Sequence, residues 1–139
     1  MTDMEKARQM LKEGGYTCVA CKGERVYPVD KRGLRPLVDW LDDRADLMGA
    51  AVADKVVGRG AAFLYLLLGV RSVYGAVMSV PAMKLLRNGG IETEWGMLTD
   101  GIRNRAGTGP CPVEYSIAVT EDPEEALMII RAELNMRGL

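Results

Sequence analysis

The chain has 139 residues, of which 48% are hydrophobic and 27% charged, and its formal net charge is −1. This composition is typical of a globular protein and excludes a largely disordered chain, so we expect a single domain over residues 1–139. Near-neutral charge, with one Phe, two Trp and five Tyr, argues against nucleic acid as a partner. The longest apolar run, residues 61–68, is far shorter than the roughly 20 residues of a membrane span, so no membrane partner is expected.

Histidine is absent and cysteine is scarce. Without histidine the chain lacks the commonest general base and metal ligand. Three cysteines are an odd number for a disulfide framework, and the charged N-terminal residues do not resemble a signal peptide. We therefore expect reduced thiols and a cytoplasmic location.

Hydrophobic periodicity predicts a first helix, a hairpin, and then strands alternating with helices. The expected helices cover residues 3–13, 34–41, 54–68 and 81–86, with a last helix that starts at Pro123 after the capping residue Asp122. The expected strands cover residues 16–21, 24–28, 48–53, 72–79 and 91–94, and short helices around a glycine-rich loop follow Met97. This order indicates a layered α/β fold with a mixed sheet.

Three segments carry a resemblance to a known family: Gly14-Gly-Tyr-Thr-Cys, Ala53-Asp-Lys-Val-Val-Gly-Arg-Gly-Ala-Ala62 and Asn104-Arg-Ala-Gly-Thr-Gly-Pro-Cys-Pro-Val-Glu114. They resemble the domain of unknown function 1893, an uncharacterised family of the cytidine-deaminase-like superfamily. The resemblance implies a cytidine-deaminase-like three-layer α/β/α fold with a mixed sheet of about five strands, and a homo-oligomer. It implies no established reaction.

The zinc ligands of that superfamily are missing from this sequence. Active members carry H-x-E or C-x-E at the start of one helix and P-C-x-x-C at the start of the next. Here the segment after Ala53 holds no His or Cys in any register, and Ala82 and Leu85 stand where the two cysteines would follow Pro81. We therefore expect no metal, no other cofactor and no zinc-dependent deamination.

Cys18 and Cys21 form a C-x-x-C in a predicted strand. A spacing of three residues points two strand side chains to opposite faces of the sheet. We interpret them as ordinary buried thiols, with a metal or redox role as the alternative.

A cluster of charged and small residues lies at the expected start of the central helix. Lys55 and Arg59, spaced i and i+4, would lie near the positive end of the helix dipole and bind an anion, while Gly58 would let a ligand approach. Asp54 would accept hydrogen bonds from the ligand. The alternative is structural: Asp54 caps the helix, the glycines allow close packing, and Asp54 or Glu114 pairs with the cations.

Cys111 occupies an expected helix start, where a thiol tends toward a lowered pKa. We weigh a nucleophile or ligand contact against a small residue that fits a tight turn; no histidine is present to act as its base. Asn104 and Arg105 would clamp a carbonyl or phosphate, or Arg105 would fasten the loop to the domain.

These residues lead to one functional hypothesis with two alternatives. We expect a pocket at the starts of the two central helices that binds an anionic, phosphate-bearing or nucleotide- or nucleobase-like small molecule. The alternatives are a non-catalytic scaffold or regulatory oligomerising domain, and a zinc-independent enzyme that uses Cys111. The candidate catalytic residues are Cys111, Glu114 and Asp54, and the candidate ligand-binding residues are Lys55, Gly58, Arg59, Ser79, Pro81, Asn104 and Arg105.

Overall fold

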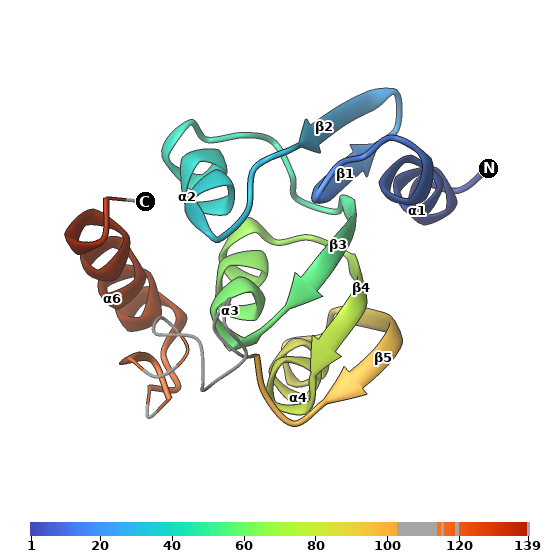
Figure 1. Ribbon diagram of the computed structural model, residues 1–139. Helices are drawn as coiled ribbons and strands as arrows, with labels where there is room; N and C mark the ends of the chain where they lie inside the picture. The colour runs from blue at the N-terminus through green and yellow to red at the C-terminus, as the bar shows by residue number, and fades with distance from the viewer. Residues whose placement is uncertain (103–113, 115, 119, 139) are drawn as a thin grey trace.

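The computed structural model describes residues 1–102, 114, 116–118 and 120–138. One five-stranded sheet lies between helix α1 on one face and helices α2, α3 and α4 on the other, with α6 packed outside α3 (Figure 1). The elements are α1 (Asp3–Glu13), β1 (Cys18–Lys22), β2 (Arg25–Val29), α2 (Arg35–Asp42), β3 (Ala51–Val57), α3 (Arg59–Leu68), β4 (Ser72–Ser79), α4 (Val80–Asn88), β5 (Glu92–Thr99) and α6 (Pro123–Met136). Within these residues no helix is both long enough and apolar enough to cross a bilayer.

The sheet has the strand order β2-β1-β3-β4-β5 and is mixed. Strand β1 pairs antiparallel with β2 and β3, whereas β3, β4 and β5 run parallel. Helices α3 and α4 form the connections between the parallel strands. The predicted α/β class and mixed sheet of about five strands are confirmed.

Local signals set most helix ends. Thr2 and Glu5 form a capping box at the start of α1, and Ser79 caps α4 through a 3.2 Å hydrogen bond from the Ala82 amide. Asp122 caps α6 in the predicted way, by accepting from the Glu124 amide over 3.1 Å. These short-range contacts explain why the bounds of α1 and the start of α6 follow directly from the sequence.

The two faces of the sheet have separate hydrophobic cores. Helix α1 covers the smaller core. Helices α2, α3, α4 and α6 cover the larger core, which contains the buried apolar side chains of α3. Cys18 lies in the larger core and Cys21 in the smaller, so the prediction that the two thiols point to opposite faces is confirmed. The predicted burial of residues 61–68 against the sheet is also confirmed.

The boundary between β3 and α3 differs from the prediction. The sequence pattern started a helix at Asp54, but β3 continues to Val57 and α3 begins at Arg59, with Gly58 as an extended N-cap residue. Pairing of Val56 and Val57 with β4 extends the strand, and both residues are β-branched. Asp54 is therefore no helix cap, and Lys55 lies on a strand rather than one helical turn from Arg59. Strand β5 likewise runs to Thr99 because it pairs with β4 along its full length.

Candidate functional site

A pocket of about 470 Å³ opens at the carboxyl ends of β3 and β4, where α3 and α4 begin. In open α/β sheets, ligands bind at this end of the strands. Four of the predicted site residues line this α3–α4 pocket together; its lining among the described residues is Arg59, Ser79, Pro81, Gly101, Ile102, Glu114, Ala118 and Glu121. A second hollow of about 440 Å³, between the β2–α2 connection and α6, is lined by none of the predicted residues that the structure describes.

Arg59 is held by protein groups on several sides. Its guanidinium donates to the carbonyl oxygens of Ile117 and Thr120 over 2.7 and 2.9 Å, and it pairs with Glu121 Oε1 over 3.1 Å. It also lies 5.0 Å from the centre of the Phe63 ring, and its side chain is only 15% exposed. Arg59 therefore fastens Ile117, Thr120 and Glu121 to the start of α3, a structural role whose partners differ from the Asp54 or Glu114 expected from the sequence.

Glu114 caps α3 from a distant part of the chain. Its Oε2 accepts a 2.8 Å hydrogen bond from the Gly60 amide. The N-cap residue, Gly58, has no side chain that could cap the helix itself. A Cβ atom at Gly58 would collide with Glu114 Oε1, so glycine here makes room for the carboxylate. Burial raises the pKa of Glu114, and the Arg59 and Gly60 amides oppose that rise by stabilising the charged form.

Asp54 belongs to a hydrogen-bonded chain beneath α3 and does not line the α3–α4 pocket. Asp54 Oδ2 accepts a 2.6 Å hydrogen bond from the Tyr65 hydroxyl, and the Cys18 sulfur lies 3.4 Å from the same hydroxyl oxygen. When Asp54 is ionised, the one hydroxyl proton of Tyr65 goes to its carboxylate, and the Cys18 thiol is then the donor in the second contact. The chain thus runs from thiol to hydroxyl to carboxylate.

Burial raises the pKa of Cys18, Tyr65 and Asp54, because it favours the neutral form of each group. Desolvation raises the pKa of Asp54 to about 6, although the hydrogen bond from Tyr65 and the backbone amides of Val56 and Lys55 act against it. Desolvation also raises the pKa values of Cys18 and Tyr65 well above their usual range. Of these three hydrogen-bonded groups, Asp54 is therefore the one whose pKa lies near neutral pH.

The sequence interpretation missed Tyr65. A buried tyrosine in an otherwise apolar helix needs a partner for its hydroxyl, and that signal was available. The identity of the partners was not, because Cys18 is 47 residues away in the chain. Glu121, which pairs with Arg59 at the pocket rim, was also missed.

The other predicted site residues lie outside the pocket or outside the described residues. Lys55 is exposed on β3 and does not line the α3–α4 pocket. Asn104, Arg105 and Cys111 fall among residues 103–113, which lie outside the described residues. Their expected roles remain predictions from the sequence.

We expect Cys111 to be the first thiol modified by brief, limiting iodoacetamide. Cys18 and Cys21 are 3% and 0% exposed, and burial raises the pKa of both thiols, which lowers their reactivity. Mass spectrometry of the peptides would locate the label. Equal or faster labelling of either buried cysteine would contradict the prediction and leave the tight turn as the explanation for Cys111.

The residues at the expected zinc position do not fit a zinc ion. Ala82 is fully buried at the start of α4 and, like Leu85, has no atom that can bind a metal. In the described part of the chain, no three His, Cys, Asp or Glu side chains gather closely enough to hold a metal ion. We assign no chemical step to zinc, and the absence of bound metal remains a prediction.

The family model of the domain of unknown function DUF1893 (TM1506) matches residues 6–134. The chain belongs to the DUF1893 family. Among solved structures, it is similar to the crystal structure of a DUF1893 family protein (TM1506) from Thermotoga maritima, with 26% identity and a TM-score of 0.86. That match covers 96% of this chain and 91% of the other. The family assignment carries no known activity.

A second solved structure shows a weaker likeness. It is a diaminohydroxyphosphoribosylaminopyrimidine deaminase/5-amino-6-(5-phosphoribosylamino)uracil reductase from Thermotoga maritima, 19% identical, with a TM-score of 0.45. The match covers 67% of this DUF1893 chain and 35% of that enzyme, and it says nothing about function. No curated protein matches the sequence.

Proposed function

We propose that this DUF1893 protein binds a small, uncharged, nucleobase-like molecule in the α3–α4 pocket. The observation that carries the proposal is that a hydrogen-bond acceptor, Glu114, and a hydrogen-bond donor, Ser79, line the same pocket. The Gly60 amide donates to Glu114 Oε2 and the Arg59 amide also stabilises the carboxylate, whose Oε1 lies beside Gly58, a residue with no side chain. Each carboxylate oxygen has two lone pairs, so Glu114 can accept a further hydrogen bond from a ligand. The Ser79 hydroxyl oxygen accepts a hydrogen bond from the Ala82 amide, so the hydroxyl proton of Ser79 can be donated to a ligand.

The flat edge of a nucleobase offers N–H groups next to carbonyl or ring-nitrogen acceptors. Glu114 would accept from the N–H group, and the Ser79 hydroxyl would donate to the neighbouring acceptor. Pro81, Ile102 and Ala118 supply apolar surface around these two polar groups. Binding pockets of this size commonly combine an apolar lining with a few oriented polar groups.

The same contacts weaken the case for a phosphate-bearing ligand. The described charged groups of the pocket are one cation, Arg59, and two carboxylates, Glu114 and Glu121. Arg59 already donates to Ile117, Thr120 and Glu121, and the Glu114 carboxylate occupies the start of α3 where an anion would bind. The nucleobase-like part of the sequence hypothesis is thus favoured over its anionic part.

Thermal unfolding with added ligands tests the proposal. Nucleobases and nucleosides should raise the melting temperature, because a ligand at 100 times its Kd adds about 2.7 kcal/mol to the stability of the native state. Inorganic phosphate at the same concentration should cause no shift. An increase with phosphate and none with any base or nucleoside would contradict the proposal.

Two carboxylate variants locate the binding site. Glu114→Gln keeps the side-chain shape but places an amide where the ligand N–H needs an acceptor, so the affinity should fall at least about tenfold. Glu121→Gln is the matched control, since Glu121 lies at the same pocket but its side chain is 83% exposed. Equal affinity of both variants and the wild type would show that the ligand binds elsewhere.

A further inference from the structure

The parallel half of the sheet has one face that the described helices cover only in part. Helix α1 packs on β1 and on the first half of β3, and it reaches β4 through Tyr74. The opposite face is covered by α2, α3 and α4. Parallel sheets are almost always buried on both faces, so the uncovered area on the α1 side needs an explanation.

An apolar row crosses this uncovered area. Val56 in β3 is aligned with Val77 in β4, and Val77 with Met97 in β5. The residues that follow Val56 and Val77, namely Val57 and Met78, are fully buried in the core under α3 and α4. The ladders skip Ala76, between Asp54–Gly75 and Val56–Val77, so the regular alternation of side chains is interrupted there. Counted from the buried Val57 and Met78, the preceding residues of the row face away from that core, toward the α1 side.

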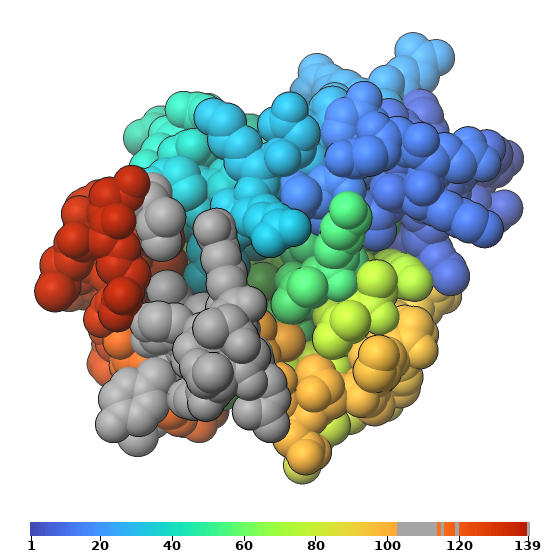
Figure 2. All heavy atoms as spheres, viewed as in Figure 1, coloured from blue at the N-terminus to red at the C-terminus, as the bar shows by residue number. Residues whose placement is uncertain are grey.

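The two ends of the row are exposed to solvent, and Val77 between them is partly buried. Val56 is 47% exposed and Met97 is 59% exposed, and both are among the large hydrophobic residues that the described surface leaves open. Figure 2 shows atoms of β3, β4 and β5 side by side at the surface, below the blue α1 region. We call the exposed surface of Val56, Val77 and Met97 the β3–β5 face.

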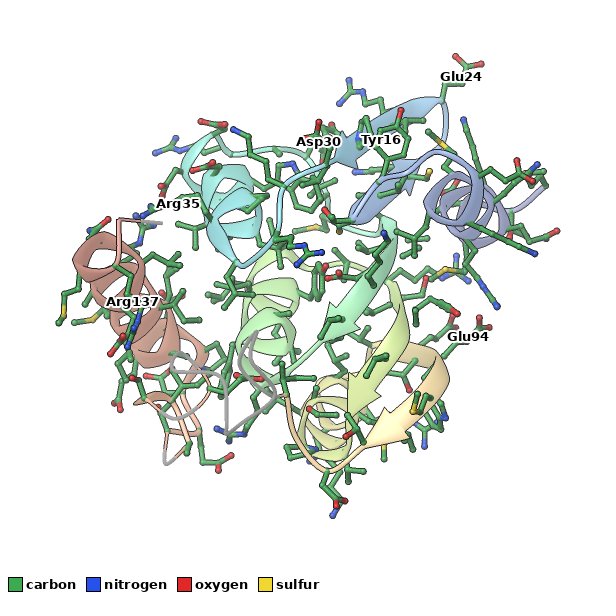
Figure 3. The ribbon with its side chains drawn as sticks, viewed as in Figure 1. Tyr16, Glu24, Asp30, Arg35, Glu94 and Arg137 are labelled. Atoms are coloured by element: carbon green, nitrogen blue, oxygen red, sulfur yellow. The ribbon has the colours of Figure 1, made fainter. Side chains whose placement is uncertain are left out.

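Charges of opposite sign flank the β3–β5 face. Lys55 is exposed beside the row on β3, whereas Glu92 and Glu94 are exposed on β5. Glu94 points away from the sheet on the α1 side (Figure 3) and pairs with Arg8 of α1 over 3.0 Å. The β3 end of the row thus lies next to a cation, Lys55, and the β5 end lies on the strand that carries two carboxylates; we call these ends the basic margin and the acidic margin.

We propose that the β3–β5 face is the interface with a second copy of this chain. A two-fold axis running along β4 would place β3 of one copy over β5 of the other. Val56 would then meet Met97, and the basic margin of each copy would meet the acidic margin of the other. The surface is thus complementary to itself, which favours a second copy over an unrelated partner.

Sedimentation velocity of the whole chain over a range of concentrations tests this interface. The molar mass obtained for the wild type should be twice the chain mass of 15.2 kDa. Met97→Glu should raise the Kd of the dimer at least about tenfold, because it puts an unpaired charge into the apolar row. Val56→Glu should act in the same way. A wild type that is monomeric at 100 μM, on the order of a weak dimer's Kd, would overturn the proposal.

Met128→Glu is the matched control. Met128 lies on α6, away from the β3–β5 face, and is 71% exposed, so it tests the effect of adding a glutamate to an open methionine position. It should leave the dimer intact, and circular dichroism should show that all variants remain folded. A dimer that survives Met97→Glu and Val56→Glu, or one that Met128→Glu dissociates equally, would place the interface elsewhere.

Discussion

Replacing Arg59 by alanine should lower the free energy of unfolding by about 3 kcal/mol, because several charge-assisted contacts to a poorly exposed guanidinium are lost together. The carbonyl groups of Ile117 and Thr120 would each lose a charged donor, and both residues are buried. For a chain of this length, the melting temperature should fall by on the order of 10 °C. Chemical denaturation and calorimetry would measure the two quantities.

Two further variants separate the geometry of Arg59 from its charge. Arg59→Lys keeps the charge but lacks the planar fork that reaches two carbonyl groups, so it should recover less than half of the lost stability. Lys84→Ala removes an exposed cation from α4 and should change stability by less than about 0.5 kcal/mol. A neutral or stabilising Arg59→Ala would mean that the cation is held free for a ligand, as the sequence hypothesis supposed.

Elements that depend on contacts between near neighbours in the chain were predictable from the sequence. The capping box of Thr2 and Glu5 fixes α1, and Asp122 with Pro123 fixes the start of α6. The hairpin of β1 and β2 is closed by a short turn at Gly23, whose positive φ of 61° favours glycine. In each case the deciding contact spans only a few residues.

The boundary of β3 and α3 was not predictable in this way, because distant groups decide it. Pairing with β4 keeps Val56 and Val57 in the strand, and Glu114, 54 residues from Gly60, supplies the cap that Gly58 lacks. An acidic residue before a helical pattern usually indicates a local cap, and Asp54 gave that signal. Its carboxylate instead binds Tyr65. The candidate site shows the same division: four of the predicted residues line one pocket, but the groups that hold Arg59 and Asp54 were not predicted.

The contribution of Asp54 to the free energy of unfolding should fall as the pH rises. Folding raises the pKa of Asp54 from 3.8 to about 6. Below pH 3.8 the group is protonated in both states and contributes nothing. Between these two values the folded state holds the proton more tightly, so the contribution to stability falls as the pH rises and levels off above about pH 7. One pKa unit corresponds to about 1.4 kcal/mol, and the partial exposure of Asp54 reduces the expected total to roughly 2 kcal/mol.

Asp54→Asn isolates this contribution, since the amide does not titrate but still offers an oxygen to the Tyr65 hydroxyl. The free energy of unfolding of the wild type minus that of the variant should be about 1.3 kcal/mol more favourable to the wild type at pH 4.5 than at pH 7.5, because about a third of the total is already lost at pH 4.5. Asp100→Asn is the control, because Asp100 is exposed after the end of β5. Tyr65→Phe removes the hydrogen bond that stabilises the carboxylate, so it should raise the pKa of Asp54 further, which NMR titration of the carboxyl carbon would detect. A flat difference between wild type and Asp54→Asn would mean that Asp54 is well solvated and that Tyr65 does not control its charge.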